Sequence, residues 1–270
     1  MISLGCSTLG FRRDQLDVAL AEIAAQGFTL VDLAMYPSYC PHFNPLTASA
    51  AEKAALRDQL AGHGMRVATL NATDGLLGIP AQREYALDYA RASLRLAQEV
   101  GAYGLTMQSG IEPARGEWLD VARGVANDLR TIGDLAADLG LELTLELHKS
   151  MLMATGQEAV ALMALVDHPA VGVAIDPSHA TYAGEDMAQI ARALGPLVKH
   201  VHLRDGRGKD IMIVPGDGDV DFGDLAAALS EIGYDRAAAI ELEYDDARAP
   251  EVRPDLARAK ALLSRYFAVA

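Results

Sequence analysis

A chain of 270 residues, 51% apolar and 22% charged, can bury a sizeable core and has the size of one α/β barrel or two small domains. Its 37 acidic and 23 basic residues give a formal charge of -14, and no cluster of lysines and arginines with interleaved aromatic residues offsets it, which argues against nucleic acid as a partner. We find no run of eighteen uncharged apolar residues and no basic leader followed by an apolar segment, so we expect a cytoplasmic protein without a membrane span. Two cysteines, Cys6 and Cys40, are too few for a disulfide framework and are expected to be free thiols.

Short apolar runs alternate with helical stretches along the whole chain. The runs that predict strands cover residues 2–8, 30–35, 66–72, 103–109, 141–147, 171–176, 198–203 and 237–243. Between them, apolar residues recur with helical spacing, and SAAE (49–52) and TGQE (155–158) have the spacing of capping boxes. No linker rich in Pro, Ser or Gly divides the pattern. Eight strands alternating with eight helices therefore predict one domain over residues 1–270, a single (β/α)8 TIM barrel.

A doubly wound open sheet is the alternative fold. It is disfavoured because no G-x-G-x-x-G follows the first strand and no Walker P-loop is present.

Ionisable residues gather where the last four predicted strands end. In a (β/α)8 barrel, side chains that point inward at the C-terminal strand ends converge on one mouth. Strand side chains alternate, so the leucines of LELTLELHK (141–149) face the helices and the polar residues face the barrel axis. The same alternation along the last four strands predicts that nine polar side chains point inward. They are Glu142, Thr144, Glu146, His148, Asp176, His200, His202, Glu241 and Glu243.

Four consecutive strand ends, each with a potential ligand, predict a metal site, because buried charges are costly unless they are paired or metal-bound. Three carboxylates and one imidazole suit one divalent ion, Mn²⁺ first, with Mg²⁺, Co²⁺ or Zn²⁺ as alternatives, and this is not the thiolate set of a structural zinc. The count alone leaves the seventh-strand ligand open between His200 and His202, and the eighth-strand ligand open between Glu241 and Glu243.

Five motifs carry a resemblance to a known family. In chain order, LTLELH, AIDPSH, KHVHLRD, PGDGDVDFGDL and AAIELEY resemble the xylose isomerase-like sugar isomerase/epimerase barrels, and MISLGCSTLGF with AAQGFTLVDL resembles the family's opening strands. The resemblance covers nearly the whole chain. That family includes ketose 3-epimerases, inosose isomerases and dehydratases and, more distantly, endonuclease IV.

The resemblance also implies roles for single residues. Metal ligands of the family fall on Glu146, Asp176, His202 and Glu241. His179, three residues after Asp176, matches the family histidine that contacts a substrate oxygen near the metal.

By this resemblance the chain is expected to be a divalent-metal-dependent isomerase or epimerase of a ketose, an inosose or a related polyol. Glu146 and Glu241 would move the proton next to a carbonyl, through a metal-stabilised enediolate. The first alternative is a lyase on the same site, of the inosose or dehydroshikimate dehydratase type. An endonuclease IV-like hydrolase would need extra histidines and a basic groove, and a non-catalytic accessory barrel is disfavoured by the complete ligand set.

Other side chains near the expected mouth are candidates for substrate binding. His148 and Gln108 lie at strand ends, His42 belongs to a long loop that could cover the mouth, and Arg204 and Arg207 could bind an anionic group. For each of them a purely structural role is the alternative.

The chain departs from the ketose 3-epimerase pattern at two positions. That subgroup carries a glutamate and an arginine where this chain has Leu152 and Gly208, so the pocket is expected to suit a different substrate. The expected partner is a small carbohydrate or polyol, and the acidic surface neither requires nor excludes a homo-oligomer.

Overall fold

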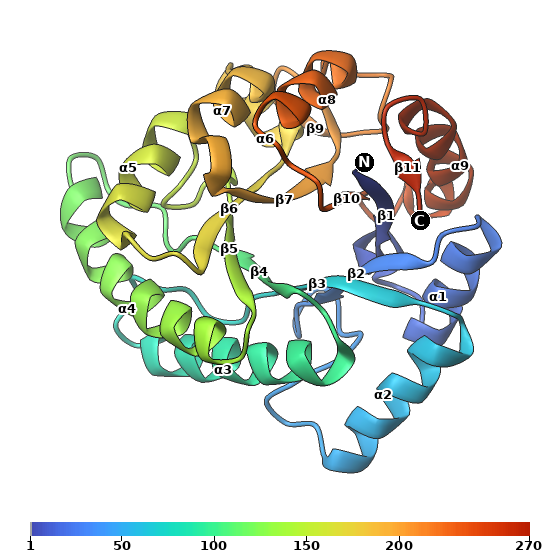
Figure 1. Ribbon diagram of the computed structural model, residues 1–270, viewed down its shortest axis with the longest axis horizontal. Coiled ribbons are helices and arrows are strands. Elements are labelled where there is room, and N and C mark those ends of the chain that lie inside the picture. The colour runs from blue at the N-terminus through green and yellow to red at the C-terminus, as the bar shows by residue number, and fades with distance from the viewer. Residues whose placement is uncertain (1) are drawn as a thin grey trace.

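Eight parallel strands close into a barrel in the computed structural model, which describes residues 2–270 (Figure 1). The strands follow one another round the ring: β1 Ser3–Ser7, β2 Leu30–Met35, β3 Arg66–Ala72, β4 Gly104–Gln108, β5 Glu142–Glu146, β6 Val171–Ile175, β7 Val198–Leu203 and β10 Ala237–Ile240. The pair β1–β10, with Gly5 opposite Ala239, closes the ring. The predicted (β/α)8 barrel is thereby confirmed.

Helices form the outer layer around the strands (Figure 1). They are α1 Leu16–Ala25, α2 Ala50–Gly62, α3 Arg83–Val100, α4 Trp118–Asp138, α5 Gly156–Val166, α6 Pro177–Ala183, α7 Met187–Leu194, α8 Phe222–Glu231 and α9 Val252–Leu263. The predicted capping box at Ser49 and Glu52 starts α2, and the Thr155 side chain accepts a hydrogen bond from the Glu158 N–H at the start of α5. No helix among residues 2–270 is long and apolar enough to cross a membrane.

Strand alternation sorts side chains between the helices and the barrel axis. Leu143, Leu145 and Leu147 are fully buried in the main apolar core, as expected for residues that face the helices. On the other side, Thr106 pairs in register with Thr144, and their hydroxyls lie 2.7 Å apart. A polar interior is therefore built below the mouth, where the strands end in ionisable groups.

The structure also differs from the sequence-based expectation. The eighth strand of the barrel, β10, ends at Ile240 rather than at residue 243, so Glu241 and Glu243 follow the strand. A hairpin of β8 Asp205–Arg207 and β9 Asp210–Ile213 comes after β7, two helices separate β6 from β7, and a short strand β11 Ala268–Val269 pairs with β1. These additions leave the ring of eight strands intact.

The glycine-rich segment after the hairpin is organised by the buried carboxylate of Asp205. Both of its oxygens accept hydrogen bonds from backbone N–H groups, four in all, at 2.8–3.1 Å; the donors are Gly206, Gly216, Gly218 and Val220. This loop leads into α8 beside the mouth.

Candidate metal centre

Four side chains from adjacent strand ends meet at the mouth of the barrel. Glu146 ends β5, Asp176 follows β6, His202 lies on β7 and Glu241 follows β10. One ligand atom from each lies within 4.8 Å of the others, and all four residues are buried. The parallel register produces this convergence because the C-terminal ends of all strands open on the same face of the barrel.

Hydrogen bonds already connect the cluster. His202 Nδ1 lies 2.8 Å from Glu146 Oε1 and 3.6 Å from Glu241 Oε2. Burial favours the neutral form of His202, but the neighbouring carboxylates of Glu241 and Glu146 outweigh it and raise the pKa of His202 to about 10. Burial raises the pKa of Glu241 above its ordinary value, whereas contact with His202 lowers the pKa of Glu146 against the effect of its own burial.

The donor set fits a divalent cation. Carboxylate oxygens and one imidazole nitrogen are ligands that Mn²⁺, Mg²⁺, Co²⁺ and Zn²⁺ all accept. Three carboxylates within a few ångströms repel one another in a buried site, and a cation between them would relieve that repulsion.

Arg204 lies beside this cluster. Its Nη2 is 2.8 Å from Asp176 Oδ2, its Nη1 is 2.5 Å from Glu243 Oε2 and its Nε is 3.0 Å from Ser178 Oγ. Only 2% of the residue is exposed. The guanidinium is therefore engaged by carboxylates of the protein itself, which leaves it poorly placed to bind an anionic substrate group.

His179 is also fully buried, next to Arg204. Its Nε2 lies 2.7 Å from Arg204 Nη2, and its Nδ1 has no hydrogen-bond partner among the described residues. The ring of His148 lies against it, with centroids 3.9 Å apart. Burial and the charge of Arg204 hold the pKa of His179 well below its usual value and so favour the neutral form of this histidine.

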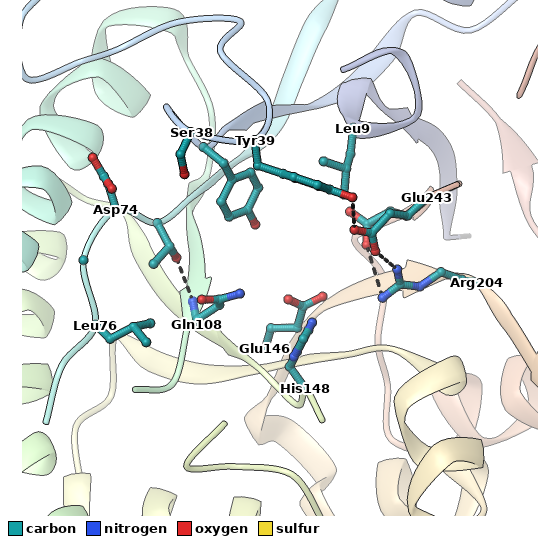
Figure 2. A pocket seen from close by; sticks show the side chains of 14 residues that line it. Leu9, Ser38, Tyr39, Asp74, Leu76, Gln108, Glu146, His148, Arg204 and Glu243 are labelled. Carbon is teal, nitrogen blue, oxygen red and sulfur yellow. Dashed lines mark hydrogen bonds and ion pairs between the residues drawn. The ribbon is translucent and has the colours of Figure 1, made fainter. Parts of the chain in front are cut away.

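A cavity of about 310 Å³ opens above the cluster. Glu146, Glu241, Arg204, His148 and Gln108 line it, and Figure 2 shows Glu146 and His148 at its floor with Glu243 and Arg204 at one side. The loops after β1, β2 and β3 and the segment after β10 form the remaining wall. Its residues are Leu9, Tyr36, Ser38, Tyr39, Thr73, Asp74, Gly75, Leu76 and Glu243.

Three residues that the sequence suggested for substrate binding, His179, His42 and Arg207, do not line this cavity. His179 is buried beside Arg204. The His42 ring nitrogens lie 3.2 Å from Thr8 Oγ1 and 3.2 Å from the Phe11 carbonyl, so the side chain ties its own loop to the segment after β1. Arg207 is exposed, and its Nε lies 3.3 Å from Asp219 Oδ1. The contacts of His42 and Arg207 are thus explained by a structural role.

The structure adds supporting residues around the cluster. Asn71 and Ser7 donate hydrogen bonds to Glu241 Oε1 at 3.1 and 3.3 Å, and the Tyr36 hydroxyl donates to Asn71 Oδ1. Sequence reasoning missed Asp32, which is fully buried on β2 with its Oδ2 3.6 Å from His202 Nε2. Its signal was an inward-facing acid inside the otherwise apolar run LVDLAM.

The fold and the site together define a (β/α)8 barrel with a candidate metal centre at the C-terminal ends of its strands. The chain belongs to the Xylose isomerase-like TIM barrel family, whose sequence pattern it matches over residues 20–263.

Curated relatives carry two different activities. The inosose dehydratase of Clostridium perfringens (strain 13 / Type A) is 32% identical over an alignment of 137 residues, and the match covers 44% of this chain and 45% of that protein. That match spans a little under half the length of the relative. The ketose 3-epimerase of Arthrobacter globiformis is 25% identical over an alignment of 254 residues, and the match covers 87% of this chain and 81% of that protein.

Solved structures share the whole fold. A D-psicose 3-epimerase crystallised in the presence of D-fructose has a TM-score of 0.80 at 19% identity, with 98% of this chain and 99% of that chain covered. The IolI protein, whose crystal structure holds a zinc atom, has a TM-score of 0.79 at 17% identity, with 98% and 99% covered. At this level of identity the likeness establishes the fold.

Proposed function

We propose that the chain is a divalent-metal-dependent isomerase or epimerase that moves a proton on a carbon next to a carbonyl group in a ketose, an inosose or a related polyol. The observation that carries the proposal is the meeting of Glu146 and Glu241 in one cation-binding cluster on the floor of the cavity. The names of the relatives support the substrate class, since they act on inososes and ketoses.

Four residues would hold the ion: Glu146, Asp176, His202 and Glu241. When bound, a divalent cation polarises a carbonyl oxygen and makes removal of the neighbouring proton easier. The IolI protein, which shares this fold, was crystallised with a zinc atom, which supports a metal ion in this chain, and we propose Mn²⁺, Mg²⁺, Co²⁺ or Zn²⁺ at the cluster.

The two glutamates would do the proton work. Asn71 and Ser7 fix one oxygen of Glu241, and its other oxygen faces the cluster, so the carboxylate is oriented before a substrate arrives. Glu146 is held by His202 at 2.8 Å. Because the two carboxylates come from β5 and from the end of β10, one could take the proton from one face of a planar intermediate while the other returns a proton to the opposite face.

Uncharged polar groups make up part of the remaining cavity wall. The side chains of Gln108, Tyr36 and Ser38 offer partners for substrate hydroxyls, and His148 lies beside Glu146. Carboxylates dominate the charged lining, and the guanidinium of Arg204 is already paired. This lining favours a neutral polyol over a phosphorylated sugar.

A dehydratase is the second candidate, favoured by the inosose dehydratase match. It would begin with the same proton removal and then expel a β-hydroxyl as water, so the product would be lighter by one water. The two departures from the ketose 3-epimerase pattern also leave room for this candidate. Leu152, which replaces the glutamate of that pattern, is fully buried, and Gly208, which replaces its arginine, lies in the hairpin turn with φ 57°.

The test compares wild-type protein with Glu241→Gln and with Glu99→Gln, a surface control on α3 that pairs with Lys53 and Arg57. Each protein is loaded with Mn²⁺, Co²⁺, Mg²⁺ or Zn²⁺, its metal content is measured, and a panel of ketoses and inososes is incubated with it in D₂O. We expect about one ion per chain and C–H exchange that Glu241→Gln loses and Glu99→Gln keeps.

The products separate the two candidates. A deuterated epimer or isomer of unchanged composition supports the isomerase, whereas loss of water supports the dehydratase. A wild-type protein that holds no ion under any of these conditions contradicts the proposal.

A further inference from the structure

Three polar side chains, Tyr103, His200 and Asp32, form a hydrogen-bonded file directly beneath the candidate metal cluster. Tyr103 Oη is 2.6 Å from His200 Nδ1, and His200 Nε2 is 2.6 Å from Asp32 Oδ2. Asp32 and His200 are fully buried, as is His202 above them. Asp32 Oδ2 in turn lies 3.6 Å from His202 Nε2. The file thus runs from Tyr103, which lines a hollow at the N-terminal end of the barrel, to the predicted metal ligand.

Strand geometry explains this arrangement. His200 and His202 are two residues apart on β7, so both point to the axis, and their rings meet edge to face with centroids 5.0 Å apart. Asp32 reaches them from β2, which pairs with β1 and β3 and not with β7. The contact therefore crosses the barrel interior.

The hydrogen bonds assign the proton of His200. A carboxylate only accepts, so His200 Nε2 carries a hydrogen and donates a hydrogen bond to Asp32. In a neutral ring, Nδ1 then accepts a hydrogen bond from the Tyr103 hydroxyl. Asp32, His200 and His202 also lie close enough together to resemble a second cation site. A cation there would have to break the 2.6 Å bond between Asp32 and His200, so we interpret the trio as a support for His202 and not as a site.

The two nitrogens of His202 face different partners. Nδ1 faces Glu146 and Glu241, the side on which an ion would bind. Nε2 faces Asp32 Oδ2 at 3.6 Å and the amide nitrogen of Asn71 at 3.5 Å. The Asn71 amide nitrogen carries two hydrogens, one of which it donates to Glu241 at 3.1 Å, and it cannot accept. Asp32 Oδ2, at 3.6 Å, is therefore the acceptor oxygen that faces Nε2 when this nitrogen carries a hydrogen.

We propose that Asp32 is a positioning residue for the metal centre, held in place by His200 and Tyr103. An imidazole that binds a cation through Nδ1 carries its hydrogen on Nε2, and a carboxylate facing that nitrogen fixes both the tautomer and the ring orientation. The inference rests on the proposed metal site and adds the residue that aims its one imidazole ligand.

The first experiment measures metal affinity. Dissociation constants for Mn²⁺ and Zn²⁺ are determined by competition with a chelating dye for wild type, Asp32→Asn and Asp128→Asn. Asp128 is the matched control because it is a buried aspartate on α4 that pairs with Arg83, outside the cavity and the file. We expect Asp32→Asn to raise the dissociation constant by about 10- to 100-fold and Asp128→Asn to leave it within about twofold.

A second measurement reports the tautomer itself. In zinc-loaded wild type, long-range ¹H–¹⁵N spectra of the histidine rings are expected to show His202 with its hydrogen on Nε2. Tyr103→Phe removes one hydroxyl from the file and is expected to weaken metal binding less than Asp32→Asn does. It keeps the affinity test available if Asp32→Asn does not fold, which circular dichroism of the metal-free protein detects.

The outcomes separate this inference from the proposed function. If wild type binds the ion but Asp32→Asn binds it equally well, the role of Asp32 is refuted and the metal site stands. If His202 in the loaded protein carries its hydrogen on Nδ1, the role of Asp32 and the binding of the ion through that nitrogen are refuted, whereas metal binding by the chain stands. If Asp32→Asn does not fold, an unchanged dissociation constant in Tyr103→Phe refutes the role of Asp32. If wild type binds no ion, the metal site and this inference both fail.

Discussion

Arg204 Nη2 lies 2.8 Å from Asp176 Oδ2, so the carboxylate predicted as a metal ligand is at the same time the partner of a buried guanidinium. The same arginine reaches Glu243 at 2.5 Å and lies 3.9 Å from Glu241 Oε2. One positive side chain thereby offsets part of the negative charge of the whole cluster. The metal-free protein depends on Arg204 for this compensation, because the surrounding carboxylates have little access to water.

Replacing Arg204 by Met is therefore expected to destabilise the metal-free protein by roughly 3–5 kcal/mol, the usual result of leaving a buried charge unpaired. Urea unfolding in the presence of EDTA measures this change. Saturating Mn²⁺ is expected to reduce the difference in unfolding free energy between Arg204→Met and wild type, because a bound ion supplies positive charge to the same carboxylates. Arg207→Met, at an exposed arginine three residues on, serves as the control and is expected to change the unfolding free energy by less than about 0.5 kcal/mol. Equal stability of the two variants in EDTA would contradict the compensating role of Arg204.

Gly218 is expected to be irreplaceable in the loop that leads to α8. A Cβ at this position would overlap Asp205 Oδ1 and the Gly206 carbonyl, and Asp205 holds the loop through four backbone N–H groups. Gly218→Ala is expected to cost roughly 1–3 kcal/mol in thermal or urea unfolding. By contrast, Gly124 is exposed on α4 with open space where a Cβ would lie, so Gly124→Ala is expected to stabilise the protein by about 0.5–1 kcal/mol. A neutral Gly218→Ala would show that the loop moves freely around Asp205.

The sequence predicts the barrel and the cluster well, because both depend on local periodicity. A period of two assigns inward and outward faces, and a parallel barrel then brings the strand ends together, which is why a cluster with Glu146 and Asp176 could be expected from the pattern. The choice of His202 over His200 and of Glu241 over Glu243 came from the family resemblance and not from the periodicity. The end of β10 was harder to place. AAAIELE continues as a plausible strand, but the regular pairing ends at Ile240.

What the sequence could not give is the choice of partner across the barrel. Nothing local to LVDLAM says that Asp32 meets a histidine of β7, because that contact depends on how far the side chains reach across the interior. Arg204 similarly looks like a free anion-binding group until its carboxylate partners are known. The hairpin β8–β9 was missed because its strands are three and four residues long and lie in a polar stretch.

Both cysteines are expected to be unreactive in the native protein. Cys6 and Cys40 are buried, and burial raises the pKa of the Cys6 thiol far above its ordinary value and that of Cys40 to about 12. Since the thiolate is the reactive form, Ellman's reagent at pH 8 is expected to label neither thiol in the folded protein and two per chain in guanidinium chloride. Rapid labelling of one thiol under native conditions would mean that its segment opens readily.

His42 gives the stability of the protein a pH dependence outside the metal cluster. Burial lowers the pKa of His42 in the folded state, although the Phe11 carbonyl close to its Nε2 acts in the opposite direction. Between that lowered pKa and the ordinary value near 6.5, the unfolded chain binds a proton that the folded chain does not, so stability rises with pH. The contribution of His42 is therefore fully present above about pH 6.5 and is lost as the pH falls through the folded-state pKa.

His42→Gln is expected to cost about 1 kcal/mol at pH 8, through weakened hydrogen bonds to its loop, and progressively less toward pH 5. Urea unfolding of both proteins from pH 5 to pH 8 measures the difference, in which the titration of all other groups cancels. A difference that stays constant over this range would mean that His42 accepts a proton as readily in the folded protein as in the unfolded chain.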